Sequence, residues 1–266
     1  GGDGDLGGGF GESDLALYTR WINSCLAEDE HVGMQLPLED NSDLYKFVSS
    51  GIAPCKLLDT LVAGAGPGEG EMTFIVIDDD DRKENVDLCV DCCRDAGCVV
   101  DDVDADGVVA GKPRDVLELV WQIIALPLKK ELAAQKKMLK LAGVKVSSVD
   151  DFLQQDLNAV VMSWATAVLS KDKAHTGKVT NLTTEWKDLD NYSTLLKVLS
   201  PKKCHDMARK LRKIKDPLEK AQHVIDTAED IGAPSLVSAE GILACRERQN
   251  WTFLVSLMCW AEKHMK

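Results

Sequence analysis

Cysteine is the residue type with the most obvious capacity for chemistry in this chain, which has nine of them. Four fall within residues 89–98, a density that a thiolate metal site would also have. Cys89, Cys92 and Cys93, however, stand at positions i, i+3 and i+4, the spacing of one buried face of a helix. The odd number of cysteines fits no disulfide framework. We therefore interpret these thiols as small buried side chains in a protein of a reducing compartment.

Closely spaced carboxylates suggest a calcium loop in one segment. Asp102, Asp104 and Asp106 precede Gly107 with the spacing that opens an EF-hand loop. The twelfth position from Asp102 is Pro113, where an EF-hand carries a bidentate glutamate. The five histidines show no ligand spacing either. We therefore predict no metal site, and we predict that casual cation binding by these carboxylates is the most that this segment supports.

Two further patterns resemble catalytic motifs and lack an essential part. The glycine-rich run 64–70 has no Lys-Ser/Thr pair of a phosphate-binding loop, and a flexible loop explains it. Cys204 and His205 are adjacent in sequence, and adjacent side chains rarely face each other as nucleophile and base. The sequence thus predicts no catalytic residues and no cofactor, and we expect that the protein is not an enzyme.

The chain contains an internal sequence repeat. Residues 81–97 match residues 216–232 at an offset of 135, which is the length of one domain and too long for a solenoid repeat. The matched pairs are Asp81 and Asp216, Glu84 and Glu219, Val90 and Ile225, Asp91 and Asp226, Asp95 and Asp230, and Gly97 and Gly232. We therefore predict two domains in tandem.

Apolar periodicity predicts that both halves are helical. In the first half it predicts helices over 15–28, 43–62 and 85–97, a loop over 63–70 and a short β-like run over 74–77. Gly51 lies near the middle of the second helix, so that helix is expected either to break in two or to pack closely there.

The last helix of each half is the most apolar. Pro113 suits the first position of a helix, and residues 116–126 have only two polar side chains. Residues 251–260 repeat this pattern at the end of the second half. A helix that is apolar nearly all round is buried on most sides. The predicted fold class is therefore all-α, with two tandem helical bundles that each surround a buried C-terminal core helix.

The formal net charge is −13 and is unevenly distributed. Residues 71–106 contain thirteen acidic and three basic side chains, a local charge of −10. Residues 129–145 contain six lysines against one glutamate, and residues 197–215 contain eight basic side chains against one aspartate. The overall acidity argues against nucleic acid as a partner. The two basic segments could meet an acidic protein surface, or they could simply be helix faces exposed to water.

Composition also predicts the domain boundaries. Residues 1–12 are mostly glycine and are predicted to be a flexible linker in a piece of a longer protein. The two bundles are expected at 13–130 and 154–264, joined by a connector at 131–153. No apolar run approaches the roughly 20 residues of a membrane span, so we predict no membrane partner.

The segments that carry this pattern resemble the calponin-homology domain, and more closely the leading tandem pair of a fimbrin (plastin). The resemblance covers about residues 13–262 and is stronger in the first half than in the second. Its motifs are Tyr18-Thr-Arg-Trp21-Ile-Asn, the stretches 43–58 and 111–124, Met162-Ser-Trp164-Ala, and the stretches 186–196 and 231–241.

The resemblance implies that the tandem pair binds filamentous actin as a composite surface, within a fimbrin-like protein that cross-links or bundles filaments. In the family the contacts come from the first helix of the first domain, from its last helix with the preceding loop, and from part of the second domain. Trp21, Trp121 and Trp164 are also typical of the family, and we interpret them as core residues. Carried onto this chain, the implied actin-binding residues are Thr19, Arg20, Asn23, Ser24, Lys112, Arg114, Glu118, Gln122, Lys129 and Lys130.

Two departures from the family qualify this expectation. The stretch before the third helix is usually basic, whereas this chain has Asp78 to Asp81, followed by further aspartates at 101–106. Because the actin surface is acidic, these residues should face away from it or weaken binding by repulsion. A fimbrin also has two such pairs, so this single pair is expected to bind without cross-linking unless it dimerises. We predict a monomer. The implied location is the cytoplasm, on the actin cytoskeleton.

Three other functions remain open from the sequence. The first is a calponin-homology adaptor for a non-actin partner such as a microtubule or signalling protein, which the aspartate-rich segment favours, since fold does not fix function. The second is a calcium-responsive structural protein, in which calcium would shift the melting temperature. The third is an enzyme that uses the residues dismissed above.

Overall fold

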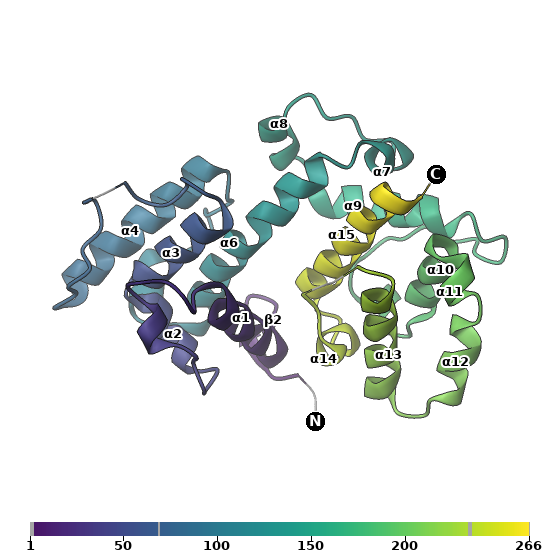
Figure 1. Ribbon diagram of the computed structural model, residues 1–266, viewed down its shortest axis with the longest axis horizontal. Coiled ribbons are helices and arrows are strands. Elements are labelled where there is room, and N and C mark those ends of the chain that lie inside the picture. Colours follow the sequence, from purple (N-terminus) through teal and green to yellow (C-terminus); the bar gives the residue numbers. More distant parts are fainter. Residues whose placement is uncertain (1–2, 69, 234–235, 266) are drawn as a thin grey trace. The chain divides into compact units, whose positions relative to one another are not determined.

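The computed structural model describes residues 3–68, 70–233 and 236–265, and they form two compact units (Figure 1). The first unit spans Gly4–Pro127, and the second begins at Leu128 and also includes Asp3. Gly1 and Gly2 of the predicted linker lie outside the described residues. In the part that is described, no helix is long and apolar enough to cross a membrane.

The first unit is a helical bundle preceded by a small hairpin. Its elements are β1 (Asp5–Gly7), β2 (Phe10–Gly11), α1 (Glu12–Cys25), η1 (Gly33–Gln35), α2 (Asp43–Ser49), α3 (Ile52–Leu61), α4 (Asp79–Ala96), α5 (Ala105–Val109) and most of α6 (Pro113–Ala133). The prediction of an all-α bundle around a C-terminal core helix is confirmed here. Val116, Leu117, Ile123 and Ile124 of α6 are fully buried.

The hairpin differs from the flexible linker that the glycine content predicts for residues 1–12. Strands β1 and β2 pair antiparallel, and Phe10 is fully buried. The Phe10 ring packs edge-on against Tyr18, with ring centroids 6.3 Å apart. One buried aromatic side chain therefore anchors a segment that composition alone marks as unstructured, because burying a phenylalanine contributes about 1.5–3 kcal/mol.

Helix α4 begins six residues earlier than predicted. The Asp78 carboxylate accepts hydrogen bonds from the backbone N–H groups of Asp80 (3.0 Å) and Asp81 (3.1 Å), so it caps the helix. The Asp81 carboxylate accepts in turn from the N–H of Ile77, at 2.7 Å. The β-like run 74–77 is irregular in the structure, which contradicts the prediction of a strand-like segment there.

Gly51 divides the predicted helix 43–62 into α2 and α3. It has φ +76°, a left-handed conformation that glycine adopts without a steric penalty. A Cβ atom there would lie 2.5 Å from the Asn85 Cβ and 2.7 Å from the Val86 nitrogen. The glycine therefore both turns the chain and lets α4 approach its backbone.

The second unit is also a helical bundle. Its elements are α7 (Lys136–Leu141), α8 (Val149–Leu153), α9 (Leu157–Leu169), η2 (Thr184–Trp186), α10 (Asp190–Leu199), α11 (Pro201–Cys204), α12 (Met207–Lys213), α13 (Pro217–Asp230), α14 (Ala239–Leu243) and α15 (Glu247–His264). Phe253, Leu254 and Met258 of α15 are fully buried, so this helix is the core of the unit.

Part of the predicted connector packs into the second unit. Helix α7 lies against α9 and α15, and Met138 is buried between them. The indole nitrogen of Trp164, on α9, donates to the Met138 sulfur at 3.3 Å. The Glu262 carboxylate, on α15, accepts from the N–H groups of Lys137 and Met138 at the start of α7. These contacts tie α7 to the core helix of the unit.

Candidate functional site

The start of α6 presents two basic side chains to solvent. Gly111, at φ +66°, reverses the chain after α5, and the Lys112 N–H donates to the carbonyl of Gly107 at 2.9 Å. Pro113 then occupies the first helical position, as predicted. Lys112 and Arg114 are both exposed. The positive end of the helix dipole adds to their charge, so this corner of the first unit favours an anionic partner.

The Arg114 side chain is partly ordered by its neighbours. Its guanidinium lies 3.3 Å from the carboxylate of Asp115, which is buried. Its aliphatic stem runs past the hairpin, since a Cβ atom on Gly8 would lie 3.0 Å from the Arg114 Cγ. The exposed cation is therefore held on a defined surface rather than extended freely into water.

Farther along α6, Glu118 and Gln122 contact each other. The Gln122 amide donates to the Glu118 carboxylate at 2.8 Å, one helical turn apart. Glu118 is half-buried, and Gln122 is 8% exposed. This pair is thus much less available to a partner than Lys112 and Arg114 are.

The predicted residues of α1 divide into two kinds. The Thr19 hydroxyl donates to the Leu15 carbonyl at 2.8 Å, and this side chain is buried. Asn23 holds the loop before α2 through two hydrogen bonds with the backbone of Leu38, at 2.8 and 3.1 Å. Arg20 and Ser24 are exposed. Of the four, Arg20 and Ser24 are the residues that the fold presents to a partner.

Lys129 and Lys130 lie in the last turns of α6, after Pro127, and belong to the second unit. Both are half-buried. Within the first unit, Tyr18 of α1 stacks on Trp121 of α6, with centroids 6.5 Å apart, so these two helices are in contact. The structure therefore brings together the two helices of the first unit that carry the predicted residues.

The tryptophans occupy different environments. Trp121 and Trp164 are buried, in agreement with the core interpretation. Trp21 is only half-buried, because its position on α1 lies at the edge of the apolar face. Burial raises the pKa of the Cys25 thiol, one turn later, and the neighbouring Trp21 side chain partly opposes this shift.

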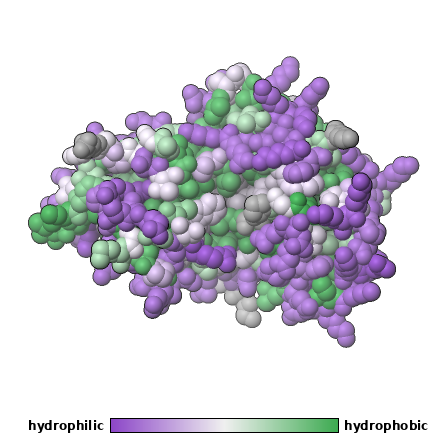
Figure 2. Space-filling view, viewed as in Figure 1, coloured by the Kyte–Doolittle hydropathy of each residue, from purple (hydrophilic) through white to green (hydrophobic). Residues whose placement is uncertain are grey.

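The segment before α4 exposes apolar side chains that the sequence analysis did not assign to a surface. Ile75 and Ile77 are 79% and 83% exposed. Figure 2 shows mostly hydrophilic side chains in view, with apolar atoms at the left end, where the segment leading into α4 lies in Figure 1. The run of apolar, mostly β-branched residues at 74–77 is the sequence signal for this surface, and it predicts a strand-like segment without revealing the exposure of Ile75 and Ile77.

Phe74 holds this segment in place. Its ring stacks on the His31 imidazole, with centroids 3.9 Å apart, and the Lys56 ammonium lies 5.3 Å from the ring centroid. The side chain of Asn85 bonds to both the N–H (3.0 Å) and the carbonyl (2.7 Å) of Thr73. The exposed isoleucines therefore follow an anchored residue.

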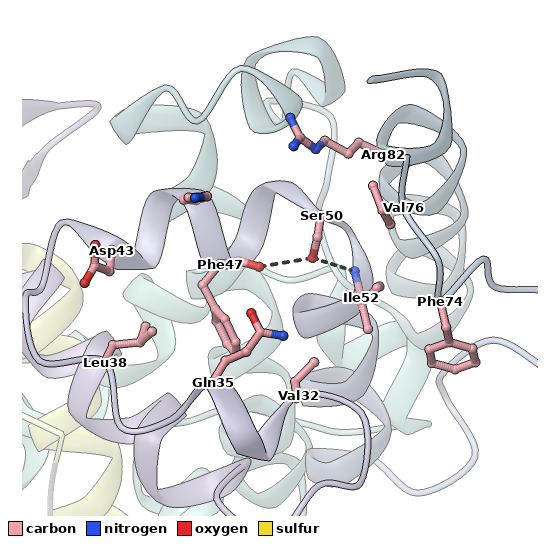
Figure 3. Close-up of a pocket in the computed structure, with 11 residues that line it drawn as sticks. Val32, Gln35, Leu38, Asp43, Phe47, Ser50, Ile52, Phe74, Val76 and Arg82 are labelled. Atoms are coloured by element: carbon pink, nitrogen blue, oxygen red, sulfur yellow. Dashed lines mark hydrogen bonds between the residues drawn. The ribbon is translucent and has the colours of Figure 1, made fainter. Parts of the chain in front are cut away.

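A hollow of about 440 Å³ lies beside this segment (Figure 3). The Ser50 hydroxyl in it donates to the Phe47 carbonyl at 3.2 Å and accepts from the Ile52 N–H at 3.3 Å, so it is engaged by the backbone. Its lining combines apolar with charged or polar side chains: Val32, Gln35, Leu38, Asp43, Lys46, Phe47, Ser50, Ile52, Phe74, Val76 and Arg82.

The motifs with possible chemistry have structural roles in this fold. The Asp104 carboxylate caps α5 by accepting from the Asp106 N–H at 3.1 Å, and Asp106 lies 3.7 Å from the ammonium of Lys83. Burial raises the pKa of the Cys204 thiol, which disfavours a thiolate nucleophile beside His205. Across residues 3–68, 70–233 and 236–265, no three metal-ligating side chains form a metal-binding arrangement.

Both halves of the chain resemble known proteins. The model of the calponin homology (CH) domain matches residues 14–129 and residues 155–263. Fimbrin-3 of Arabidopsis thaliana is 28% identical over 249 residues, which are 92% of this chain and 34% of that protein. Plastin-3 of Danio rerio is 25% identical over 260 residues, which are 93% of this chain and 40% of that protein. The chain thus spans well under half the length of these relatives.

A solved structure has the same fold. The crystal structure of the actin-crosslinking core of Schizosaccharomyces pombe fimbrin aligns with a TM-score of 0.72 at 23% sequence identity. The alignment covers 93% of this chain and 50% of that one.

Proposed function

The chain belongs to the calponin homology domain family through both of its halves, and on that premise we propose that it binds filamentous actin as a tandem pair. The observation that carries this proposal is the exposed pair Lys112 and Arg114 at the start of α6, in a unit that is otherwise strongly acidic. The relatives named fimbrin and plastin, and the actin-crosslinking core with the same fold, support actin as the partner.

The proposed mechanism is a composite electrostatic surface. Lys112, Arg114 and Arg20 of the first domain contact the acidic filament, and Ser24 adds a hydrogen-bonding group. Lys129 and Lys130 extend the basic surface along the sequence. Glu118 and Gln122 form a hydrogen-bonded pair that sets the shape of this face of α6. Thr19 and Asn23 stabilise α1 and the loop that follows it, without contacting the filament. Favourable charge also speeds the encounter with the filament.

We further propose that this pair is one filament-binding half of a fimbrin-like cross-linking protein of the cytoplasmic actin cytoskeleton, and that its role is binding rather than catalysis. One pair provides one filament site and therefore binds without bundling. The boundaries proposed for its parts are 13–130 and 154–264, with 131–153 as the connector. Within this one filament site, each domain supplies a weak docking surface, and the connector raises the effective concentration of the second surface once the first is bound, provided that both reach the filament.

Co-sedimentation with filamentous actin across a salt series tests the proposal. We expect saturable pelleting at high speed that weakens with salt, and no pelleting of bundles at low speed. The double variant Lys112→Glu with Arg114→Glu should weaken binding by more than about tenfold at low salt, because opposite charges become like charges. A matched reversal of exposed Lys171 and Lys173, to which the proposal assigns no contact, should leave the affinity unchanged.

An adaptor for a non-actin partner is the second candidate, and the acidic segment 71–106 is the observation that favours it. If the wild-type chain fails to pellet with actin even at low salt, the actin proposal is wrong. The partner would then be a protein with a basic surface, which the exposed carboxylates of this segment would attract.

A further inference from the structure

A hollow in the first domain lies between two segments that combine apolar with acidic side chains. One is the stretch 28–43, which leads from α1 to the start of α2 and contains six acidic residues and no lysine or arginine. The other is the segment 74–81, which leads into α4 and contains four aspartates and no lysine or arginine. Leu38 of the first and Val76 of the second line the hollow from two sides (Figure 3). The hollow is therefore bordered by negative charge.

Two cationic side chains, those of Lys46 and Arg82, also line the hollow. The Arg82 guanidinium is already paired, since it lies 2.8 Å from the Asp79 carboxylate. The acidic residues of the two bordering segments outnumber these two cations. Because the local charge stays strongly negative, the surface attracts a cationic partner and repels an anionic one.

Exposed apolar side chains extend the surface beyond the hollow. Phe74 and Val76 line the hollow, whereas Ile75 and Ile77, which alternate with them, are largely exposed to water. Met34, in the other bordering segment, is 98% exposed. Exposed apolar side chains with polar borders are typical of protein interaction sites. A small molecule in the hollow would leave Met34 and the two isoleucines in water, whereas a peptide can cover them together with the hollow.

The backbone of the segment before α4 is also available to a partner. The Asn85 side chain holds Thr73 at its start, and the Asp81 carboxylate accepts from the N–H of Ile77 at its end. Between these two anchors, the N–H and C=O groups of residues 74–76 form no hydrogen bond with any residue of the described part of the chain. An anchored segment with unpaired backbone groups is the kind of edge to which an extended peptide adds as a strand.

The second domain shows that the fold does not require this surface. The connection 62–78, between α3 and α4, corresponds to the connection 200–216, between α10 and α13, and the two have equal length. Residues 200–216 form the helices α11 and α12 and contain seven lysines and arginines against two aspartates. Residues 62–78 contain three acidic side chains and no lysine or arginine. The apolar and acidic surface is therefore a particular property of the first domain.

We propose that this surface binds a basic peptide segment in an extended conformation, with apolar residues at its centre and lysine or arginine at both ends. The central residues fill the hollow and cover the two exposed isoleucines, and their backbone pairs with residues 74–76. One cationic end lies near the aspartates 78–81. The other lies near Glu30, which adjoins the start of the segment through the stacking of His31 on Phe74. This binding goes beyond the proposed actin contact, in which basic side chains of this chain meet an acidic filament.

Fluorescence anisotropy of a labelled synthetic peptide tests the proposal on the full chain. The probe is the peptide Lys-Lys-Val-Leu-Val-Leu-Lys-Lys, and the control peptide has glutamate in place of every lysine. We expect saturable binding of the lysine peptide at low salt, weakening as the salt concentration rises, and no binding of the glutamate peptide. If the lysine peptide shows no saturable binding at low salt, the proposal is wrong.

Serine variants separate this site from the general attraction of a cation to an acidic protein. The double variant Ile75→Ser with Ile77→Ser should weaken binding of the lysine peptide by about tenfold or more, because the peptide then covers less apolar surface. Val99→Ser is the matched control, since Val99 is also exposed and precedes another run of aspartates, at 101–106. The control should bind the peptide as wild type does. An unchanged affinity in the double variant, or an equal loss in the control, would overturn the proposal.

Amide hydrogen exchange in the wild-type chain locates the bound peptide without any substitution. At least one amide proton of residues 74–76 should exchange more slowly when the lysine peptide is bound, because it donates to a peptide carbonyl. The amides of residues 101–106 should exchange at the same rate with and without the peptide. Binding without protection at 74–76 would contradict strand addition. Circular dichroism checks that the serine variants are folded, and none of these measurements depends on whether the chain binds actin.

Discussion

The two domains turn the chain at equivalent positions with the same backbone conformation and different residues. Gly51 (φ +76°) precedes the ten-residue helix α3, and Leu189 (φ +71°) precedes the ten-residue helix α10. In the first domain the glycine admits the backbone of α4 at Asn85. In the second, the Leu189 side chain is 2% exposed and contributes to the core. The first domain thus gains close helix contact, and the second gains apolar burial while bearing backbone strain.

A second difference concerns the buried asparagine of each domain. Asn85, on α4, holds the loop at Thr73 and also donates to the Ser50 carbonyl at 3.3 Å. Asn250, on the core helix α15, accepts from the Tyr192 hydroxyl at 2.7 Å and donates to the Leu182 carbonyl at 2.8 Å. Both side chains are at most 1% exposed. In the first domain the buried asparagine is on the peripheral helix α4 and fixes a loop. In the second domain it is on the central helix α15 and fixes groups in the interior.

The largest expected effect comes from removing the glycine turn. Gly51→Ala should destabilise the first domain by about 3–5 kcal/mol, because the new Cβ collides with the backbone of α4 and the left-handed conformation becomes strained. Hydrogen–deuterium exchange, followed separately in α4 and α15, should show faster exchange in α4.

Gly64→Ala is the matched control for this variant. Gly64 has φ +77° and no atom within 4 Å of an added Cβ, so the variant should lose only about 1 kcal/mol of stability, through the backbone strain of alanine at positive φ. If the two glycine variants lose equal stability, the close approach of α4 has no energetic importance and the contrast with Leu189 fails.

The asparagine clamps should come next in size. Asn85→Ala and Asn250→Ala should each cost about 2–4 kcal/mol of unfolding free energy, because each leaves buried backbone or hydroxyl groups without partners. Urea unfolding provides the measurement, and exposed Asn41→Ala should stay within about 0.5 kcal/mol of wild type. A negligible loss for Asn250→Ala would show that water or a rearranged side chain replaces the clamp.

Tyr192 makes the second domain sensitive to alkali. Burial raises the pKa of its hydroxyl well above the ordinary value of about 10, so the folded state keeps a proton that the unfolded state releases. Its stabilising contribution is complete below about pH 10 and is lost as pH rises, at up to about 1.4 kcal/mol per pH unit. Tyr192→Phe should flatten this slope in urea unfolding between about pH 10 and 11. If Tyr192→Phe leaves the pH dependence of the unfolding free energy unchanged, Tyr192 is not the source of the alkaline sensitivity.

The smallest effect should be at Asp206 on the basic segment. Hydrogen bonding to Arg209 and then the Lys210 ammonium lower the pKa of its carboxyl to about 2. Its contribution to stability is therefore present above about pH 4 and is lost as pH falls toward 2. Asp206→Asn should reduce the acid sensitivity of the second domain slightly, measured by thermal unfolding at pH 5 and pH 3. If the variant is as acid-sensitive as wild type, the interactions of Asp206 with Arg209 and Lys210 do not contribute to the stability of the second domain.

Sequence pattern alone predicted the elements that depend on local chemistry. Pro113 at the start of α6 and the break at Gly51 follow from the restricted backbone of those residues, and both are confirmed. The repeat at Gly97 and Gly232 is likewise a local signal, because both glycines end their helices in the left-handed conformation.

Long-range contacts account for what the sequence did not predict. Phe10 anchors the hairpin through Tyr18, and no short pattern in a glycine-rich segment signals that contact. Asn23 is on the polar side of α1, yet its side-chain amide is engaged in hydrogen bonds with the backbone of Leu38 in the following loop. Thr19 is buried by the packing of α1, and its hydroxyl is satisfied within its own helix by the Leu15 carbonyl. The exposure of candidate site residues thus depends on tertiary partners that periodicity does not reveal.

The aspartates that begin α4 limit how this surface can diverge. Asp78 and Asp81 bind backbone N–H groups, so a lysine at either place would remove a helix cap as well as a charge. Asp79 pairs with Arg82 on the solvent-facing side at 2.8 Å. Asp80 is therefore the member of the run that can change sign with least cost to folding. Selection for a folded helix would therefore retain the acidic residues at 78 and 81, whereas position 80 can change the charge of this surface without the loss of a helix cap.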